Sequence, residues 1–337
     1  MILPLDLGEN SYDIIIERGA LSKIGELLNL NRKVLVLTDS GVPQEYIKTV
    51  SNACFDSYIY TIESGEASKS LENYGKIISF MIENSFTRTD ALVAVGGGVV
   101  GDLGGFVAST YMRGIDFYNV PTTLLSQLDS SIGGKVAIDF DGVKNVVGAF
   151  YQPKRVLIDS DTLKTLDKRQ LMAGLCEGIK MAATSDSDLF SLIENSKSLE
   201  NDLDSIILGG LKIKKDVVTK DPKEKNLRKV LNFGHTIGHA VESASELGTL
   251  LHGECVAIGM LPMCKKDVRD RLENVLNKYN LPTKTDISSD ALLSYIKRDK
   301  KANGNKITVI YVDKIGSFEM LDIEIDEMKK YIDGGIL

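Results

Sequence analysis

The sequence predicts two domains, an N-terminal α/β domain with a mostly parallel sheet and a mostly α-helical C-terminal domain. In the first half, short continuous apolar runs alternate with amphipathic segments, a pattern typical of buried parallel strands covered by helices. From about residue 161 onward the patterns are mainly helical. A chain of 337 residues also exceeds the size at which one core usually stops growing. We therefore expect domains at residues 1–160 and 161–337.

The individual elements follow from the spacing of apolar residues. Residues 33–38, 90–95 and 115–120 are expected to form buried strands, and residues 71–84 repeat apolar side chains at helical spacing. In the second half we expect helices over 165–184, 188–199, 203–220, 230–247 and 255–278. A late strand, 307–312, is expected to pair with 316–320.

Composition excludes several classes of protein. The 43% hydrophobic and 26% charged content is ordinary for a globular domain, and the net charge of −7 offers no basic surface to nucleic acid. There is no 18-residue apolar run to span a membrane and no secretory signal. The cysteines are far apart and form no Cys-x-x-Cys pair: Cys54, Cys176, Cys255 and Cys264. We therefore expect a cytoplasmic protein with reduced thiols and no nucleic-acid or membrane partner.

All three histidines lie in one 18-residue stretch, at His235, His239 and His252. Histidine is the commonest metal ligand and can carry protons near neutral pH. His235 and His239 are four residues apart, so a helix would place them on one face. The alternative is a pair of capping or hydrogen-bonded histidines, and spacing alone leaves both interpretations open.

A glycine-rich turn follows the second expected strand. Gly96, Gly98 and Gly101 fit G-x-G-x-x-G, with a strand before and an apolar helical segment after. Such a turn lets a pyrophosphate approach the backbone N–H groups at a helix start, which favours a Rossmann-like dinucleotide site over a simple packing turn. Asp39, just after the first strand, could accept ribose hydroxyls, and Glu66 and Lys69 could contact the adenosine half.

Charged residues also occur among small and apolar ones further along. Gly133-Gly134-Lys135, preceded by Asp129 and followed by Lys144-Asn145, could bind a phosphate or carboxylate, although a solvated surface loop is the alternative. Glu177 and Lys180 are three residues apart in an apolar helical segment, where a charge needs a partner or a metal. The alternative is a surface ion pair.

One polar stripe leads into the histidines. Arg228, Asn232, His235 and His239 are spaced so that a continuous helix would place them on one face. Lys214 and Glu224 precede this stripe. A polar face of this kind can line a cleft.

These motifs together resemble the 3-dehydroquinate synthase family, within the sugar-phosphate cyclases. The matching segments are GGGVVGDLGGF (96–106), YMRG (111–114), PTTLL (121–125), GGK (133–135), KN (144–145), AGLCEGIK (173–180), LRKVLNFGHTIGH (227–239) and HGE (252–254). The resemblance implies an NAD-binding α/β domain and a helical domain holding a divalent metal, with substrate in the cleft between them. It also implies a homodimer.

The resemblance makes Glu177, His235 and His252 the metal ligands. One carboxylate and two imidazoles leave positions open for substrate oxygens, as a catalytic zinc site requires. Zinc and cobalt both suit such ligands. The resemblance gives His239 no role as a metal ligand and leaves it to transfer protons and contact the phosphate.

The implied reaction converts 3-deoxy-D-arabino-heptulosonate 7-phosphate into 3-dehydroquinate and phosphate. Transient oxidation by NAD⁺ makes a neighbouring proton acidic, phosphate leaves, the ketone is reduced again, and an intramolecular aldol step closes the ring. By resemblance, the residues that bind or act on the substrate are Arg113, Lys135, Asn145, Lys180, Lys214, Glu224, Arg228, Asn232, His239 and one of Lys300 or Lys301.

The implied NAD contacts are Asp39, Glu66, Lys69, Gly97, Gly98, Val99, Asp102, Thr122, Thr123, Leu125, Thr162, Thr165 and Leu166, with Asp129 and Lys144 at the nicotinamide end. The sequence departs from the family pattern at residues 166–170, where Leu-Asp-Lys-Arg-Gln replaces Leu-Pro-x-Arg-Glu. Three alternatives stay open: another cyclase such as 2-deoxy-scyllo-inosose synthase, a polyol dehydrogenase of the glycerol dehydrogenase type, and a non-catalytic NAD-binding protein.

Overall fold

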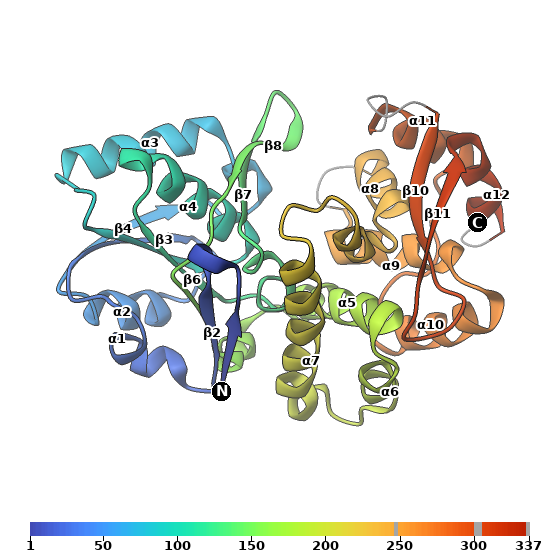
Figure 1. Cartoon of the computed structure of the whole chain (residues 1–337), viewed down its shortest axis with the longest axis horizontal. Helices are drawn as coiled ribbons and strands as arrows, with labels where there is room; N and C mark the ends of the chain where they lie inside the picture. The colour runs from blue at the N-terminus through green and yellow to red at the C-terminus, as the bar shows by residue number, and fades with distance from the viewer. Residues whose placement is uncertain (246–248, 300–304, 335–337) are drawn as a thin grey trace. The chain divides into compact units, whose positions relative to one another are not determined.

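The structure is a computed structural model that describes residues 1–245, 249–299 and 305–334. The chain divides into two compact units, Met1–Asp167 and Lys168–Leu337 (Figure 1). The first unit is an α/β unit and the second is mostly helical, so the predicted fold class is confirmed. Among the residues described, no helix combines the length and apolarity that crossing a bilayer requires.

Seven strands among the described residues form the sheet of the first unit, in the order β1-β2-β9-β6-β5-β3-β4. The first pair is antiparallel and every other pair in this sheet is parallel. The strands are β1 (Ile2–Leu5), β2 (Tyr12–Ile16), β3 (Lys33–Asp39), β4 (Asp56–Ile62), β5 (Ala91–Gly96), β6 (Asp116–Pro121) and β9 (Arg155–Ile158). The three strands predicted from apolar runs are β3, β5 and β6, at the centre of the sheet.

The sheet carries helices on both faces (Figure 1). Alternate residues of a strand point to opposite faces, so Leu35 and Leu37 of β3 pack in one core cluster, and Val34 and Val36 pack in the other. Helices α3 (Leu71–Glu83) and α4 (Gly98–Thr110) cover the first face, and α1 (Ile24–Leu27) and α2 (Gln44–Asn52) cover the second.

The lysine-containing segment after β6 folds into a π-helical turn, Ser126–Ser130, and a hairpin of β7 (Lys135–Phe140) and β8 (Val143–Phe150). Asp141 and Gly142 at its tip both have positive φ, 51° and 75°, as a two-residue type I′ turn requires. The hairpin packs on α4 so closely that a Cβ at Gly105 would lie 2.3 Å from Val136. It therefore presents Lys135, Lys144 and Asn145 on a defined scaffold.

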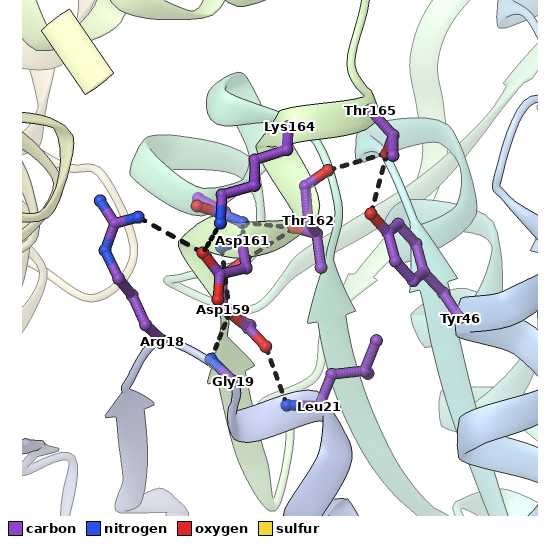
Figure 2. A network of polar contacts seen from close by, with 10 residues as sticks. Arg18, Gly19, Leu21, Tyr46, Asp159, Asp161, Thr162, Lys164 and Thr165 are labelled. Atoms are coloured by element: carbon purple, nitrogen blue, oxygen red, sulfur yellow. Dashed lines mark hydrogen bonds and ion pairs between the residues drawn. The ribbon is translucent and has the colours of Figure 1, made fainter. Parts of the chain in front are cut away.

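The division between the units falls after Asp167 and not at residue 160. A 3₁₀ segment, Ser160–Thr165, belongs to the first unit (Figure 2). The Asp159 carboxylate, just before it, accepts hydrogen bonds from the backbone N–H groups of Gly19 and Leu21, both at 2.9 Å. The Tyr46 and Thr165 hydroxyls are hydrogen-bonded at 3.0 Å. These contacts keep the segment on the first unit.

The second unit contains α5 (Lys168–Ser185), α6 (Ser187–Asn195), α7 (Leu199–Lys220), α8 (His235–Ala244), α9 (His252–Met260), α10 (Lys266–Lys278), α11 (Ser289–Asp299) and α12 (Met328–Asp333). Among the described residues of this unit, β10 (Lys306–Tyr311) pairs with β11 (Glu319–Glu324). The partner strand expected at 316–320 lies at 319–324. Gly316, with φ 87°, belongs to the connection between the two strands.

Two predicted helices are wrong because each is interrupted. The helix expected over 230–247 divides into a 3₁₀ turn, Leu227–Asn232, and α8, since Gly234 between them has φ 77°. The expected continuous face from Arg228 to His239 does not exist. The helix expected over 255–278 divides into α9 and α10, because Pro262 opens a 3₁₀ turn between them.

Candidate functional site

The three histidines of the chain come together on two neighbouring helices. His235 is the first residue of α8 and His252 the first residue of α9, while His239 lies one turn into α8. One ring nitrogen from each of the three lies within 4.8 Å of the others. The ring centroids of His235 are 5.2 Å from those of both His239 and His252.

Glu177 of α5 joins this cluster. Its Oε1 lies 3.9 Å from Nε2 of His235 and 3.8 Å from Nε2 of His252. Its other oxygen, Oε2, forms an ion pair with Nζ of Lys180, and both side chains are 1% exposed. The buried carboxylate and lysine expected in this segment are thus paired, and the remaining oxygen faces the histidines.

The donor set fits a divalent metal. Oε1 of Glu177 is buried and has no hydrogen-bond donor among the described residues. Two ligand atoms, each at about 2.2 Å from one zinc ion, can be separated by up to roughly 4.4 Å, so both Glu177–histidine distances are compatible with a shared ion. Glu177, His235 and His252 could therefore hold the ion.

Hydrogen bonds orient the two imidazoles. Nδ1 of His235 donates to the carbonyl of Phe233 at 3.2 Å, and Nδ1 of His252 donates to Oε2 of Glu242 at 3.0 Å. A carbonyl or carboxylate only accepts, so each Nδ1 carries the proton and the Nε2 of a neutral ring keeps its lone pair for a metal.

Burial and neighbouring charges set the protonation of these rings. Burial, with the nearby Lys180 ammonium, lowers the pKa of His235 well below its ordinary value, which favours the neutral, metal-binding form. Burial also opposes charge on His252, but the hydrogen bond to Glu242 and the charge of Glu177 outweigh it and raise the pKa of this histidine.

His239 lies near enough to be a third imidazole ligand. It is exposed, whereas the side chain of His235 is 13% exposed. Its assignment to the substrate rests on the family resemblance and stays a prediction.

Glycines bring the ligand-bearing helices together. A Cβ at Gly259 of α9 would lie 2.1 Å from the carbonyl oxygen of Gly234, and one at Gly238 of α8 would lie 3.0 Å from that of Cys255. Because neither glycine has a side chain, the α8 and α9 backbones approach closely, and the rings of His235 and His252 lie with their centroids 5.2 Å apart.

Three cationic side chains expected at the substrate are buried in the same unit. Lys180 on α5, Lys214 on α7 and Arg228 after α7 are 1%, 3% and 3% exposed. Nζ of Lys180 also donates to the carbonyl of Leu231, four residues before His235 in the chain. Buried cations of this kind suit a ligand that carries fixed negative charge.

A tight loop carries Glu224, Arg228 and Asn232. The Asp221 carboxylate organises this loop by accepting from the backbone N–H groups of Lys225, Asn226 and Arg228 at 2.9, 2.7 and 3.1 Å. Glu224 has φ 55°, and its Oε1 accepts from Nδ2 of Asn232 at 3.0 Å.

Several expected substrate residues lie in the first unit or outside the described residues. Lys135 is on β7 and Asn145 on β8 of the first unit. Arg113 belongs to the first unit, where it follows Met112 in a turn with φ 69° and 49° at the two residues. Lys300 and Lys301 lie outside the described residues.

The glycine turn of the first unit connects β5 directly to α4. Gly97 is the N-cap residue of α4 and Gly98 its first residue, so the N–H groups of a 13-residue helix begin at this turn. A Cβ at Gly97 would lie 3.1 Å from the Thr123 side chain, and the Thr122 N–H donates to the Gly96 carbonyl at 2.9 Å. Helix starts of this kind bind phosphates.

A buried lysine connects several predicted residues of the first unit. Nζ of Lys69, 4% exposed, lies 2.6 Å from Oδ2 of Asp102 and 3.8 Å from Oε1 of Glu66. It also donates to Oδ1 of Asn145 on β8. Residues expected at the NAD and a residue expected at the substrate therefore form one polar cluster.

The other predicted NAD contacts lie at strand ends, on the loops and turns after strands, and in α4. Asp39 ends β3, and burial raises the pKa of its carboxyl, which accepts from the Gly41 N–H at 2.8 Å. The Thr162 hydroxyl donates to the Asp159 carbonyl at 2.7 Å and accepts from Gln127 at 3.1 Å. The remaining positions are Val99 in α4, Leu125 and Asp129 at the π-helical turn, and Thr165 and Leu166 at the end of the 3₁₀ segment.

The sequence does not predict the residues that hold the proposed ligands and the substrate loop in place. Glu242 holds His252, Asp221 shapes the loop before the histidines, and Glu254 pairs with Arg169. Glu254 is the last residue of the HGE motif (252–254), but the spacing of the motif does not show what its side chain contacts.

The fold and the site define a class of protein: an α/β unit with a glycine turn at a helix start, and a helical unit with a histidine–carboxylate centre. The family model for the 3-dehydroquinate synthase N-terminal domain matches residues 59–173, and the model for its C-terminal domain matches residues 174–302. The 3-dehydroquinate synthase of Enterococcus faecalis is 42% identical, with 100% of both chains covered.

Two solved structures share the whole fold. A 2-deoxy-scyllo-inosose synthase complexed with carbaglucose-6-phosphate, NAD⁺ and Co²⁺ has a TM-score of 0.88 at 24% identity, covering 100% of both chains. The 2-epi-5-epi-valiolone synthase from Streptomyces hygroscopicus, with NAD⁺ and Zn²⁺ bound, has a TM-score of 0.89 at 25% identity, covering 98% of both chains. The chain belongs to the 3-dehydroquinate synthase family and is an enzyme.

Proposed function

We propose that this enzyme converts 3-deoxy-D-arabino-heptulosonate 7-phosphate into 3-dehydroquinate and phosphate, as a carbon–oxygen lyase. The observation that carries the proposal is the convergence of Glu177 Oε1 with Nε2 of His235 and His252, beside buried Lys180. Full-length identity of 42% to a relative named 3-dehydroquinate synthase supports the same reaction.

We propose NAD⁺ at the first unit and a divalent metal, zinc or cobalt, at the second. The bound groups would supply reversible hydride transfer and Lewis-acid polarisation of substrate oxygens. Glu177, His235 and His252 would hold the metal, and the α4 start with Gly97 and Gly98 would face the pyrophosphate. The solved valiolone synthase, which binds NAD⁺ and Zn²⁺, supports this pair of cofactors.

The chain's own side chains would bind the substrate and move its protons. Lys180, Lys214 and Arg228 supply positive charge for a substrate with a carboxylate and a phosphate, and Arg228 offers the planar fork that matches either group. Glu224 and Asn232, hydrogen-bonded to each other, would orient a substrate hydroxyl. His239, which is more exposed than His235 and His252, would exchange a proton with the substrate.

The other predicted contacts would complete the two sites. From the first unit, Arg113, Lys135 and Asn145 would reach the substrate, and Asp129 and Lys144 the nicotinamide. A homodimer, a cytoplasmic location and the absence of nucleic-acid or membrane partners stay predictions.

A comparison of substrates tests the proposal against its rivals. The purified enzyme with NAD⁺ and Co²⁺ or Zn²⁺ is expected to release phosphate from the heptulosonate phosphate and not from glucose 6-phosphate. Turnover of glucose 6-phosphate alone would contradict the assignment. Sustained accumulation of free NADH without phosphate release would instead indicate a polyol dehydrogenase.

A further inference from the structure

Arg169 and Glu254 form a two-pronged ion pair between α5 and α9, two of the three helices that carry proposed metal ligands. Nε of Arg169 donates to Oε1 of Glu254, and Nη2 donates to Oε2, both at 2.7 Å. Arg169 is the second residue of α5, which also carries Glu177, and Glu254 is the third residue of α9, which begins at His252. The pair therefore ties together the starts of these helices.

The same carboxylate also fixes the entry of the chain into α9. Oε2 of Glu254 accepts from the backbone N–H of Leu251 at 2.8 Å, as in a capping box. Nη2 of Arg169 donates in addition to the carbonyl of Thr249 at 2.6 Å. The two side chains thus hold backbone on the N-terminal side of His252 and helix on its C-terminal side.

His252 needs this anchoring more than its partner ligands do. Its side chain is 31% exposed, against 13% for His235 and 1% for Glu177, so surrounding packing restrains it least. Like His235, it is the first residue of its helix, where the backbone N–H groups lack partners within the helix, so the greater exposure of its side chain is what sets His252 apart.

We infer that Arg169 and Glu254 are positioning residues for metal binding: they hold His252 in register with Glu177. This inference rests on the proposed metal site. Arg169 binds the carbonyl of Thr249 and Glu254 binds the N–H of Leu251, so the pair acts on His252 through the backbone that precedes it. Loss of a group that orients a ligand typically weakens metal affinity about 10–100-fold.

A second arginine–glutamate pair in the same unit provides a matched control. Arg271 of α10 binds Glu194 of α6 in the same two-pronged way, through Nε at 3.0 Å and Nη2 at 2.7 Å. The exposed fractions of the arginines are similar, 47% for Arg271 and 51% for Arg169. Neither α6 nor α10 carries a proposed ligand, so disrupting this pair should leave the metal site unchanged.

The experiment compares Co²⁺ and Zn²⁺ affinities of the full chain by chelator competition. The variants are Arg169→Lys, Glu254→Gln, Arg271→Lys and His252→Ala, with circular dichroism of each metal-free protein to confirm the fold. Arg169→Lys and Glu254→Gln should bind both metals about 10–100-fold more weakly and alter the visible absorption of bound Co²⁺. Arg271→Lys should match the wild type, and His252→Ala should show the largest loss.

The possible failures are distinguishable. If His252→Ala loses affinity while folded Arg169→Lys and Glu254→Gln both stay within twofold of the wild type, the positioning role is overturned and the metal site stands. If His252→Ala itself binds as the wild type does, the proposed ligand set fails. An equal loss in Arg271→Lys would show a general stability effect and would also overturn the inference.

Discussion

Gly253 of α9 packs against the backbone of Ala173 in α5, where a Cβ at position 253 would lie 1.9 Å from the Ala173 carbonyl oxygen. The two helices therefore touch without an intervening side chain. His252 stands next to this contact on one helix and Glu177 one turn beyond it on the other. The distance between these two proposed ligands depends on a glycine at position 253.

Gly253→Ala should separate α9 from α5. The added methyl meets backbone, which cannot move aside as a flexible side chain can, so we expect a loss of about 1–3 kcal/mol in unfolding free energy. Metal affinity should fall with it. Thermal and denaturant unfolding measure the first effect, and chelator competition measures the second.

Gly75→Ala provides the opposite expectation for the same chemical change. Gly75 lies exposed within α3, and a Cβ there would meet nothing within 4 Å. Alanine is the better helix former, so this variant should gain up to about 1 kcal/mol. Equal effects at positions 75 and 253 would contradict the proposed role of the Gly253 contact.

Removal of the Glu242 carboxylate should change both the acidity and the metal affinity of His252. Glu242 raises the pKa of His252 through the hydrogen bond to Nδ1, so Glu242→Ala should lower that pKa in the metal-free protein. Metal affinity should fall about 10–100-fold, with a smaller loss for Glu242→Gln. Nuclear magnetic resonance can follow the titration directly, because the chain has only three histidines. An unchanged titration of His252 would rule out this contact.

Asp221→Asn should disturb the substrate loop and spare the metal. One carboxylate accepts three backbone N–H groups here, and an amide replaces one of its oxygens with a donor that cannot accept them. We expect a higher KM for the heptulosonate phosphate, with Co²⁺ affinity unchanged. Loss of metal affinity with an unchanged KM would show that the loop supports the metal site and not the substrate site, which would contradict this prediction.

The same residue gives a dependence of stability on pH. Backbone hydrogen bonds from Lys225 and Asn226 lower the pKa of Asp221 below its ordinary value of 3.8. A carboxyl whose pKa is lower in the folded state stabilises the protein above the unfolded pKa, and the contribution is lost as the pH falls through the folded value. The stability difference between wild type and Asp221→Asn should therefore be full near neutral pH and shrink below about pH 4.

Lys69→Met should weaken NAD⁺ binding and lower the unfolding free energy of the first unit. Lys69 is 4% exposed and lies 2.6 Å from Asp102, so its loss leaves a partly buried carboxylate without this partner, at a cost of about 1–3 kcal/mol. Lys76→Met is the control, because Lys76 pairs with Glu72 at the same 2.6 Å with both side chains largely exposed. That change should leave both the unfolding free energy and the NAD⁺ affinity, the latter measured by calorimetry, close to those of the wild type.

The sequence predicts those parts of the fold that local pattern determines. The central strands β3 and β5 are buried on both faces, so they appear as continuous apolar runs. The edge strand β4 and the β7–β8 hairpin mix exposed polar and apolar residues and lack such a signal. The sequence does not predict the break before α8, because the helical spacing of residues continues through Gly234. Both the positive φ of Gly234 and the close approach of Val256 and Met260 favour a glycine there, and only the folded chain reveals them.

The site divides in the same way. The position of all three histidines in one short stretch indicates His235 and His252 as candidate ligands. The apolar surroundings of Glu177 indicate that its charge needs a partner or a metal. Only the family resemblance combines this residue of α5 with those of α8 and α9 in one ligand set. The orienting contact of Glu242 and the ion pair of Arg169 with Glu254 depend on which atoms meet in space. No spacing along the chain specifies them.

The most direct test of the proposed reaction is the number of phosphates released per NAD⁺. The metal-loaded enzyme, freed of bound nucleotide, would receive the heptulosonate phosphate in large excess over a small, known amount of NAD⁺. If oxidation and re-reduction occur within one catalytic cycle, phosphate should exceed NAD⁺ many times over while free NADH stays negligible. Phosphate release that stops at one equivalent of NAD⁺, or NADH that accumulates in step with product, would contradict the account.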